Sequence, residues 1–266
     1  MFVSPYRDEK FILVNDADAN GGYVDMSIKA MRLLGSEVTR LADRINVSDY
    51  IHRDIVINIP SDFTSLSYIA SSVLSAGDKS DVRILNYHPG ETINERVLLD
   101  VYRTLGVSES RDSANHTLRL RCKRPTSQLQ AEISLKELPS AATNIMAAAS
   151  NSLAQISFSG VSGINNHKCQ RAFVISENIR RMGGSNSMLF NEIGMFEKLL
   201  INGHGPLGGG VELKSYKDHR VCAANLIAAL GAKKECLVHD TEKLDDGFPG
   251  LIEALKSLGV NIKLSN

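Results

Sequence analysis

The stretch Lys214–Ala232 reads KSYKDHRVCAANLIAALGA, and it predicts a buried helix with a charged beginning. Asp218 is placed to cap this helix by accepting hydrogen bonds from the N–H groups of its first turn. His219 and Arg220 fall in that turn, where the N–H groups and the helix dipole favour an anion. The residues that follow are mostly small and apolar. The pattern indicates either an anion site or a capping aspartate beside two solvated charges.

The same order of elements recurs along the chain as a small-residue helix, a strand and a second helix that ends at a glycine. The three terminal glycines, Gly106, Gly183 and Gly259, lie 77 and then 76 residues apart, and Gly35 ends an earlier, incomplete copy. The first helices are predicted over 62–76, 140–150 and 218–230. The strands are predicted over 82–86, 155–159 and 236–239, and the second helices over 91–105, 168–182 and 248–258.

A period of this length is longer than a solenoid repeat, so it favours an α/β fold whose units pack about a pseudo-symmetry axis. Before the repeats, we expect a strand over 11–14, a helix over 23–34 and strands over 37–41 and 54–59. Repeated units with no site at all explain the pattern equally well. Only the polar residues that do not repeat can therefore indicate a function.

The composition excludes several classes of protein. Hydrophobic residues make up 43% of the 266 residues, and Lys+Arg and Asp+Glu number 30 each, which argues against a broad basic face for nucleic acid. No apolar run approaches the ~20 residues that span a membrane, and the N-terminus lacks the apolar core of a signal peptide. The four cysteines show no framework spacing and predict free thiols. We expect a cytoplasmic protein.

Two motif searches give negative results. The segment Gly203–Gly208 matches GxGxxG, but Gly209, Gly210 and a strand-like stretch follow it, so no helix would meet a pyrophosphate. We predict a hairpin or a mobile loop there. The seven histidines show no HxxxH or HExxH spacing, so neither a metal nor another cofactor is expected.

A second cationic cluster lies in the segment 165–171, which reads NNHKCQR. It places His167, Lys168 and Arg171 just before or inside a predicted helix. If this helix start faces the one at Asp218, these side chains surround one cleft together with His219 and Arg220. Such a cleft would suit a ligand with several negative charges, such as a phosphorylated carboxylate. The alternative is a scattered, solvated surface.

These residues carry a resemblance to a known family. Tyr216–Arg220, Phe248-Pro249 and Leu258-Gly259 resemble the C-terminal part of 5-enolpyruvylshikimate-3-phosphate synthase. Four further segments resemble its YxDMT helix, DxSSASY turn, PDAA motif and KE(S/T)DR motif. They are, in that order, Tyr23–Ser27, Ser61–Tyr68, Leu138–Ala142 and His167–Arg171.

The resemblance implies a two-domain fold, each domain built of three βαβαββ units about a pseudo-threefold axis. Residues 1–60 would be a remnant of the first domain, and 61–266 most of the second. Family members transfer the enolpyruvyl group of phosphoenolpyruvate to a hydroxyl of shikimate 3-phosphate, without a metal. The resemblance implies substrate binding by Tyr23, Arg171, His219 and Arg220. It places Ser140, His167 and Lys168 at catalytic positions.

The chain departs from the family pattern at several of these positions. Ser140 replaces an aspartate that accepts a proton in the family, and a neutral serine cannot serve as that base at pH 7. His167 replaces a lysine, Lys168 a glutamate and Asp246 a lysine. We therefore expect a divergent or split transferase for phosphoenolpyruvate and shikimate 3-phosphate or a related anionic acceptor. The alternative is a non-catalytic relative that binds an anionic ligand or a protein partner.

The helix over 23–34 also predicts association. Its apolar residues exceed what one small hairpin of strands can cover, and covering them would stabilise the chain by about 25 cal/mol per Å² of apolar surface. The cover could come from a second copy of the chain or from a separate chain that supplies the missing N-terminal half. Repacking of residues 1–60 onto the larger domain is the alternative.

Overall fold

The fold is that of a computed structural model, which describes residues 10–13, 21–42, 44–49, 56, 58–78, 80–90, 92–123, 128–166 and 169–264. Its helices are α1 Gly21–Leu33, α2 Phe63–Ala76, α3 Ile93–Thr104, α4 Ala142–Ala149, α5 Arg171–Arg181, α6 His219–Leu230 and α7 Leu251–Ser257, with the short 3₁₀ helices η2 Ser162–Asn165 and η3 Thr241–Asp246. Its strands are β1 Phe11–Leu13, β2 Val38–Arg40, β3 Arg44–Val47, β4 Asp81–Ile84, β5 Val107–Asp112, β6 Thr117–Cys122, β7 Leu129–Ser134, β8 Ala154–Ser159, β9 Ser185–Phe190, β10 Phe196–Asn202, β11 Glu212–Leu213 and β12 Leu237–Val238. None of these helices is long and apolar enough to cross a membrane.

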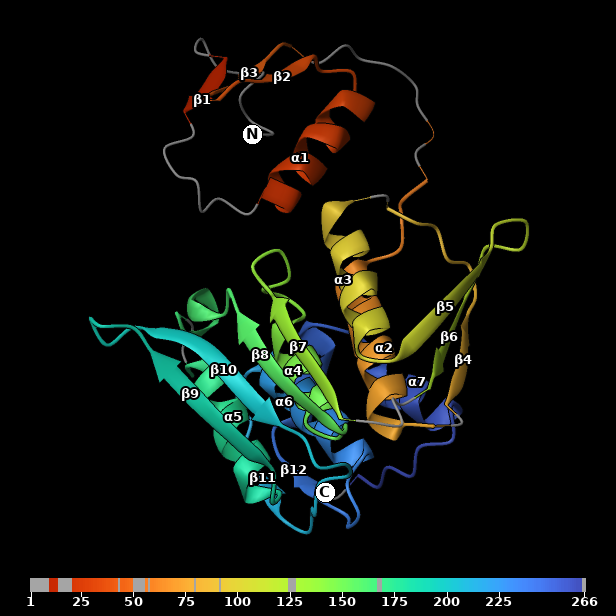
Figure 1. The fold of residues 1–266 in the computed structure, drawn as a ribbon. Coiled ribbons are helices and arrows are strands. Elements are labelled where there is room, and N and C mark those ends of the chain that lie inside the picture. The colour runs from red at the N-terminus through yellow and green to blue at the C-terminus, as the bar shows by residue number, and fades with distance from the viewer. Residues whose placement is uncertain are drawn as a thin grey trace.

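One arrangement of elements recurs along the chain (Figure 1). We number the copies β1-α1-β2-β3, α2-β4-α3-β5-β6, β7-α4-β8-α5-β9-β10 and β11-α6-β12-α7. The sheets of the first three copies have the orders β1-β3-β2, β4-β6-β5 and β7-β8-β10-β9. The fourth copy opens with the parallel pair β11-β12, as the third opens with β7-β8. The third copy shows the whole βαβαββ unit, which confirms the predicted fold class.

A glycine in the left-handed conformation follows α1 in the first copy and the second helix of each later copy. Gly35, Gly106, Gly183 and Gly259 have φ angles of 93°, 98°, 83° and 91°. Glycine has no Cβ and takes this conformation without strain, so it ends a helix and turns the chain; a strand follows Gly35, Gly106 and Gly183. The repeat that the sequence predicts from these glycines is confirmed.

The first helices of the second, third and fourth copies pack against one another (Figure 1). Their buried side chains join residues that are 77 positions apart. Asn144 Nδ2 donates to Ser67 Oγ (3.2 Å), Thr143 Oγ1 to the Arg220 carbonyl (3.4 Å), and Asn151 Nδ2 to the Ala228 carbonyl (2.9 Å). Equivalent positions of successive copies therefore meet at one axis, as expected for pseudo-threefold packing.

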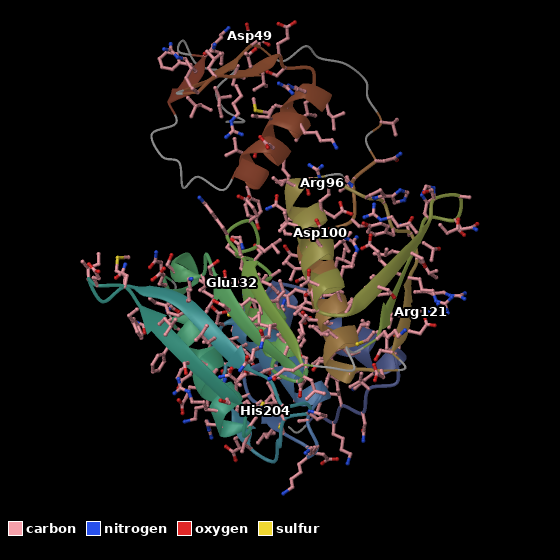
Figure 2. The ribbon with its side chains drawn as sticks, viewed as in Figure 1. Asp49, Arg96, Asp100, Arg121, Glu132 and His204 are labelled. Atoms are coloured by element: carbon pink, nitrogen blue, oxygen red, sulfur yellow. The ribbon has the colours of Figure 1, made fainter. Side chains whose placement is uncertain are left out.

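The apolar side chains form two separate clusters. The larger one spans the second to fourth copies and includes the fully buried alanines of α4. The smaller one lies between α1 and its hairpin and consists of Ile28, Met31, Val38, Ile45 and Val47. Charged side chains lie outside these clusters, and all six residues labelled in Figure 2 are exposed. The division into domains at residues 60 and 61 stays a prediction.

Contacts join α1 to the larger part of the molecule. The rings of Tyr23 and Phe63 lie 6.0 Å apart between centroids, and Lys29 Nζ donates to the Gly90 carbonyl at 3.0 Å. Gly22 comes so close to α3 that a Cβ there would lie 1.9 Å from Asn94 Oδ1. These contacts place the first copy beside the N-terminal end of α3.

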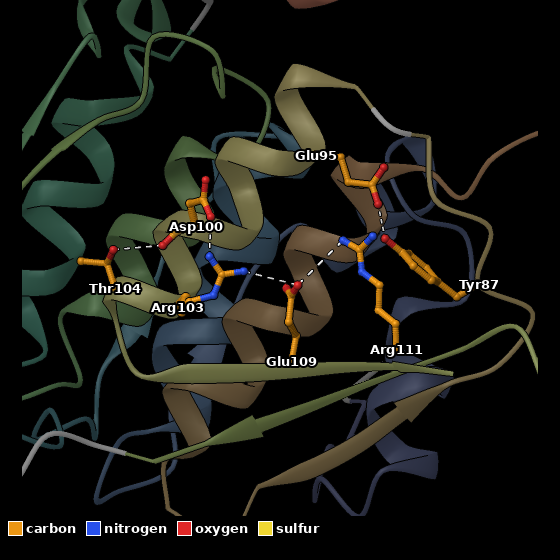
Figure 3. Close-up of polar contacts among 7 residues, drawn as sticks. All are labelled: Tyr87, Glu95, Asp100, Arg103, Thr104, Glu109 and Arg111. Atoms are coloured by element: carbon orange, nitrogen blue, oxygen red, sulfur yellow. Dashed lines mark hydrogen bonds and ion pairs between the residues drawn. The ribbon is translucent and has the colours of Figure 1, made fainter. Parts of the chain in front are cut away.

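A polar network fixes the hairpin of the second copy against α3 (Figure 3). Arg103 donates to Asp100 and, at 3.4 Å, to Glu109, and the guanidinium of Arg111 lies 3.8 Å from the same Glu109 oxygen. The buried carboxylate of Glu95 accepts from the Tyr87 hydroxyl and from the Gly90 N–H (2.6 Å). Burial and this carboxylate raise the pKa of Tyr87. The two arginines pair with acidic side chains of the same network, and Glu95 bonds to neutral donors. These groups therefore stabilise the fold.

The structure bears on two expected segments, the strand over 54–59 and the loop over 203–208. The strand expected over 54–59 is wrong at its described positions, where Val56 is 99% exposed and no strand forms. The strand lies instead at β3, whose alternate residues Ile45 and Val47 cover α1. The segment Gly203–Gly208 is a loop as predicted, and a Cβ on Gly203 would lie 2.2 Å from the Ser152 carbonyl oxygen.

Candidate anion-binding site

The site is built around the first turn of α6. Asp218 caps the helix as predicted, with Oδ1 accepting from the N–H groups of Arg220 (2.9 Å) and Val221 (3.3 Å). Its other oxygen accepts from Arg171 Nε at 2.9 Å, and the two side chains are 11% and 9% exposed. Burial favours a raised pKa for Asp218, but Arg171 and the two amides outweigh it and lower the pKa. One carboxylate therefore starts α6 and fixes the first residue of α5.

The guanidinium of Arg220 is the group that most needs a partner. Its Nη1 atom is buried and has no hydrogen-bond partner among the described residues. Leaving a buried charged donor unpaired costs more than the 1–3 kcal/mol typical of a neutral group. Arg171 makes its side-chain hydrogen bond through Nε, and neither Nη atom bonds to another residue in the described ranges. The buried Arg171 guanidinium and the buried Nη1 atom of Arg220 thus remain able to donate to an anion.

His219 lies between these cations and the loop before α7. Burial lowers its pKa most, and the positive charges of Arg220 and Arg171 lower it further, against the opposing carboxylates of Asp218 and Asp246. A Cβ on Gly247 would lie 2.5 Å from the His219 ring, so only glycine fits beside it. Because the His219 pKa lies below 6.5, the imidazole is mostly neutral at pH 7.

We expect the His219 pKa to lie below its ordinary value of 6.5 in the free protein and to rise when phosphate is added. A bound anion would offset the repulsion from the arginines. Because the folded-state pKa is lowered, protonation favours unfolding, and this contribution to stability is lost as the pH falls below 6.5. NMR titration of the imidazole measures the shift. An unchanged pKa at saturating phosphate would contradict the site.

The exposed His204 provides an internal control for this titration. It lies in the loop beside the C-terminal end of α4, where the Gly205 N–H donates to the Ser152 carbonyl at 3.1 Å. The site is at the opposite, N-terminal end of the same helix bundle. Phosphate is therefore expected to shift the His219 resonance and to leave that of His204 in place.

Two further predicted site residues meet at the start of α4. The Tyr23 hydroxyl and Ser140 Oγ form a hydrogen bond between the first and third copies, 117 residues apart. Ser140 is buried in the turn before α4, and Thr143 in the first turn of α4 donates to the Arg220 carbonyl. This link places the Tyr23–Ser140 pair next to the first turn of α6. His167 and Lys168 lie outside the described residues.

Sequence reasoning missed two side chains of this region. Tyr68 on α2 is buried, and this burial raises its pKa. The positive charges of Arg220 and Arg171 have the opposite, smaller effect. The Tyr68 ring lies 5.8 Å from that of Phe248. Burial and the Asp218 carboxylate raise the pKa of Cys169 to about 11, so it is a neutral thiol at pH 7. Both residues lie in segments that the sequence had already singled out, but nothing in their spacing marks them.

Comparison with known proteins shows the family of this chain. A profile of the EPSP synthase (3-phosphoshikimate 1-carboxyvinyltransferase) family matches residues 1–255. The chain belongs to this family. A 3-phosphoshikimate 1-carboxyvinyltransferase of Methanococcus aeolicus is 22% identical over 254 residues, which cover 91% of this chain and 54% of the relative. The chain therefore spans about half the length of the curated relatives it matches.

Solved structures share the EPSP synthase fold with this chain. The EPSP synthase of Acinetobacter baumannii superposes with a TM-score of 0.70 at 18% identity, covering 89% of this chain and 54% of that one. The enolpyruvyl transferase NikO from Streptomyces tendae gives a TM-score of 0.64 at 16% identity, with coverages of 90% and 54%. The likeness concerns the fold, and it agrees with the repeated units described above.

Proposed function

We propose that this chain is one part of an enolpyruvyl transferase that acts on phosphoenolpyruvate and on shikimate 3-phosphate or a related anionic acceptor. The observation that carries the proposal is the buried Arg220 Nη1 atom, which has no partner in the described ranges. A protein anion at this point would satisfy it, but Asp218 already bonds to Arg171 and to the amides of α6. An anionic ligand fits the remaining donors.

The proposal assigns each side chain a task. Arg171 and Arg220 would hold a carboxylate or phosphate group, because guanidinium donors match the geometry of both. The neutral His219 would add a hydrogen bond beside them. The Tyr23–Ser140 pair would face the acceptor from the start of α4. His167 and Lys168 would complete the catalytic positions, and the remaining part of the transferase would come from another chain.

A second function is favoured by the bond between Tyr23 and Ser140. The hydroxyl of Ser140 is held by a tyrosine, where the family pattern has a carboxylate that accepts a proton. Asp246 also adds a negative charge, which raises the pKa of His219. These exchanges fit a non-catalytic relative that binds an anionic ligand or a protein partner. Binding without turnover of phosphoenolpyruvate distinguishes this function from the transferase.

Replacing Arg220 with alanine is expected to weaken phosphoenolpyruvate binding roughly 10- to 100-fold, as expected for the loss of a charge-assisted hydrogen bond worth about 1.5–3 kcal/mol. Isothermal titration calorimetry of the full chain with phosphoenolpyruvate, and separately with inorganic phosphate, measures the change. Arg121→Ala is the control, because Arg121 is half-exposed and pairs with Asp81 at 3.1 Å. Equal affinities in the wild type and in Arg220→Ala would end the proposal.

A partner was expected on residues 1–60 because α1 carries apolar side chains. The structure shows that other parts of the same chain cover several of them. Ile28 and Met31 are buried under the chain's own β2 and β3, and Tyr23 and Met26 pack against the larger cluster. The large apolar side chains still exposed here are Leu33 at the end of α1 and Leu34 directly after it. Much of its cover therefore comes from the chain itself, which is the alternative that the sequence left open. A second chain remains part of the proposal.

A further inference from the structure

Asn144 on α4 is a fully buried side chain whose amide group has a defined orientation. Its Nδ2 atom donates to Ser67 Oγ at 3.2 Å, and Ser67 Oγ donates its own hydrogen to the Thr64 carbonyl at 2.6 Å. Because a hydroxyl carries a single hydrogen, Ser67 Oγ can only accept from Asn144. The amide of Asn144 is therefore fixed with its NH₂ group, and not its oxygen, toward Ser67.

The same NH₂ group also donates to the phenol of Tyr68. A side-chain hydrogen bond with Asn144 lowers the pKa of Tyr68, which is the effect of a donor on the phenol oxygen, because such a donor favours the ionised form. Asn144 Oδ1 is buried and has no hydrogen-bond partner among the described residues, so the phenol does not donate to it. Tyr68 therefore accepts from Asn144 and keeps its own hydrogen for another group.

The free hydrogen of Tyr68 lies in the anion-binding site. A Cβ on Gly247 would lie 3.2 Å from the Tyr68 oxygen and 2.5 Å from the His219 ring, so the phenol and the imidazole lie beside the same backbone position. The positive charges of Arg220 and Arg171 reach the phenol and lower its pKa. No residue in the described ranges accepts the hydrogen, and Tyr68 is only 2% exposed, so leaving this donor unpaired is costly.

We propose that Tyr68 is a further ligand-binding residue of this site, whose hydroxyl donates to an anionic oxygen of the ligand held by Arg171 and Arg220. A phosphate and a carboxylate both offer such an oxygen. Asn144 is a positioning residue, because its amide occupies the phenol oxygen from the other side and leaves the hydrogen for the ligand. The inference rests on the proposed anion site and adds to it a directional donor that carries no charge.

Tyr68→Phe tests this role, because it removes the hydroxyl and keeps the ring that packs against Phe248. Isothermal titration calorimetry of the full chain uses inorganic phosphate as one probe and pyruvate, a carboxylate without phosphate, as the other. We expect the affinity for at least one probe to fall by about tenfold or more, as for the loss of a hydrogen bond to a charged group. A loss for phosphate alone assigns the hydroxyl to a phosphate oxygen, and a loss for pyruvate alone to a carboxylate oxygen.

Tyr102→Phe is the matched control, because it removes a buried phenol hydroxyl outside the site. The Tyr102 hydroxyl bonds to Ser71 Oγ at 2.5 Å and to the Ser67 carbonyl at 2.9 Å. Its loss is expected to leave both affinities unchanged. Wild-type affinities in Tyr68→Phe, with weaker binding in Arg220→Ala, would overturn the role of Tyr68 and leave the proposed anion site standing. A wild type that binds neither probe would overturn both.

The dependence of binding on ionic strength separates a lost hydrogen bond from a disturbed site. Arg220→Ala removes a charge, so the affinity for phosphate should fall less steeply with added salt than it does in the wild type. Tyr68→Phe removes no charge and should keep the wild-type dependence. A flatter dependence in Tyr68→Phe would show that the arginines had moved, and would overturn a direct contact.

A spectroscopic measurement tests the contact without a variant in the titrated protein. The chain has seven tyrosines, and ¹³C labelling at Cζ gives each phenol a resonance that reports on its hydrogen bonds. The Tyr68 resonance is identified by its loss in Tyr68→Phe. Saturating phosphate or pyruvate is expected to shift it and to leave that of Tyr102 in place. A Tyr68 resonance that stays unmoved at saturation with both probes would contradict the proposal.

Discussion

Asp218→Asn is expected to lower the free energy of unfolding by about 3–5 kcal/mol, the cost of breaking a buried ion pair by removing one partner. Asparagine caps a helix about as well as aspartate, so the start of α6 keeps its hydrogen bonds. What changes is the charge beside Arg171, whose side chain is 9% exposed. The arginine would then be buried close to Arg220 with no opposing carboxylate, and the fold would lose stability.

Urea unfolding of the two proteins at pH 7 measures this loss. Asp81→Asn is the matched control, because Asp81 pairs with Arg119 and Arg121 on the surface, where ion pairs contribute little. The Asp218 pKa is lowered in the fold, so its contribution is present above the ordinary value of 3.8 and is lost as the pH falls through the folded-state pKa. Similar losses in the two variants at pH 7 would show that the Arg171–Asp218 pair has no special role.

The features that sequence predicted well depend on local chemistry. A capping aspartate and a glycine after a helix act within a few residues, so Asp218 and the four terminal glycines located α6 and the repeat. The period then implied that equivalent positions meet, and the hydrogen bonds across 77 residues confirm it. β3 was missed because four residues carry too short an alternation to stand out.

The features that sequence did not predict depend on packing between distant segments. Asp218 was expected to cap a helix, but its bond to Arg171 requires that α5 and α6 begin side by side. The Tyr23–Ser140 bond joins two predicted site residues that no spacing rule brings together. The burial of Tyr68 also becomes visible only when the copies are assembled. The family resemblance indicated candidate site residues, and the structure shows which of the described ones meet.

The isolated chain is expected to lack ordinary synthase activity toward shikimate 3-phosphate. Loss of one positioned proton-transfer group typically removes roughly 10²–10⁴ of rate. The family pattern has an aspartate at position 140, and Ser140 instead shares a hydrogen bond with Tyr23 in a buried turn. A neutral serine hydroxyl cannot accept the substrate proton at pH 7 as a carboxylate does.

The charge at Asp246 adds to this loss. The negative charge of the Asp246 carboxylate raises the pKa of His219. The family pattern has a lysine at position 246, and its positive charge would attract a carboxylate or phosphate. Phosphate release from phosphoenolpyruvate, measured with and without shikimate 3-phosphate, gives the rate. Ser140→Ala should leave that low rate unchanged, because the hydroxyl is not the base, while Arg220→Ala should weaken binding roughly 10- to 100-fold. A wild-type chain that releases phosphate at normal enzyme rates would show that another group takes the proton, and would move the search to His167 and Lys168.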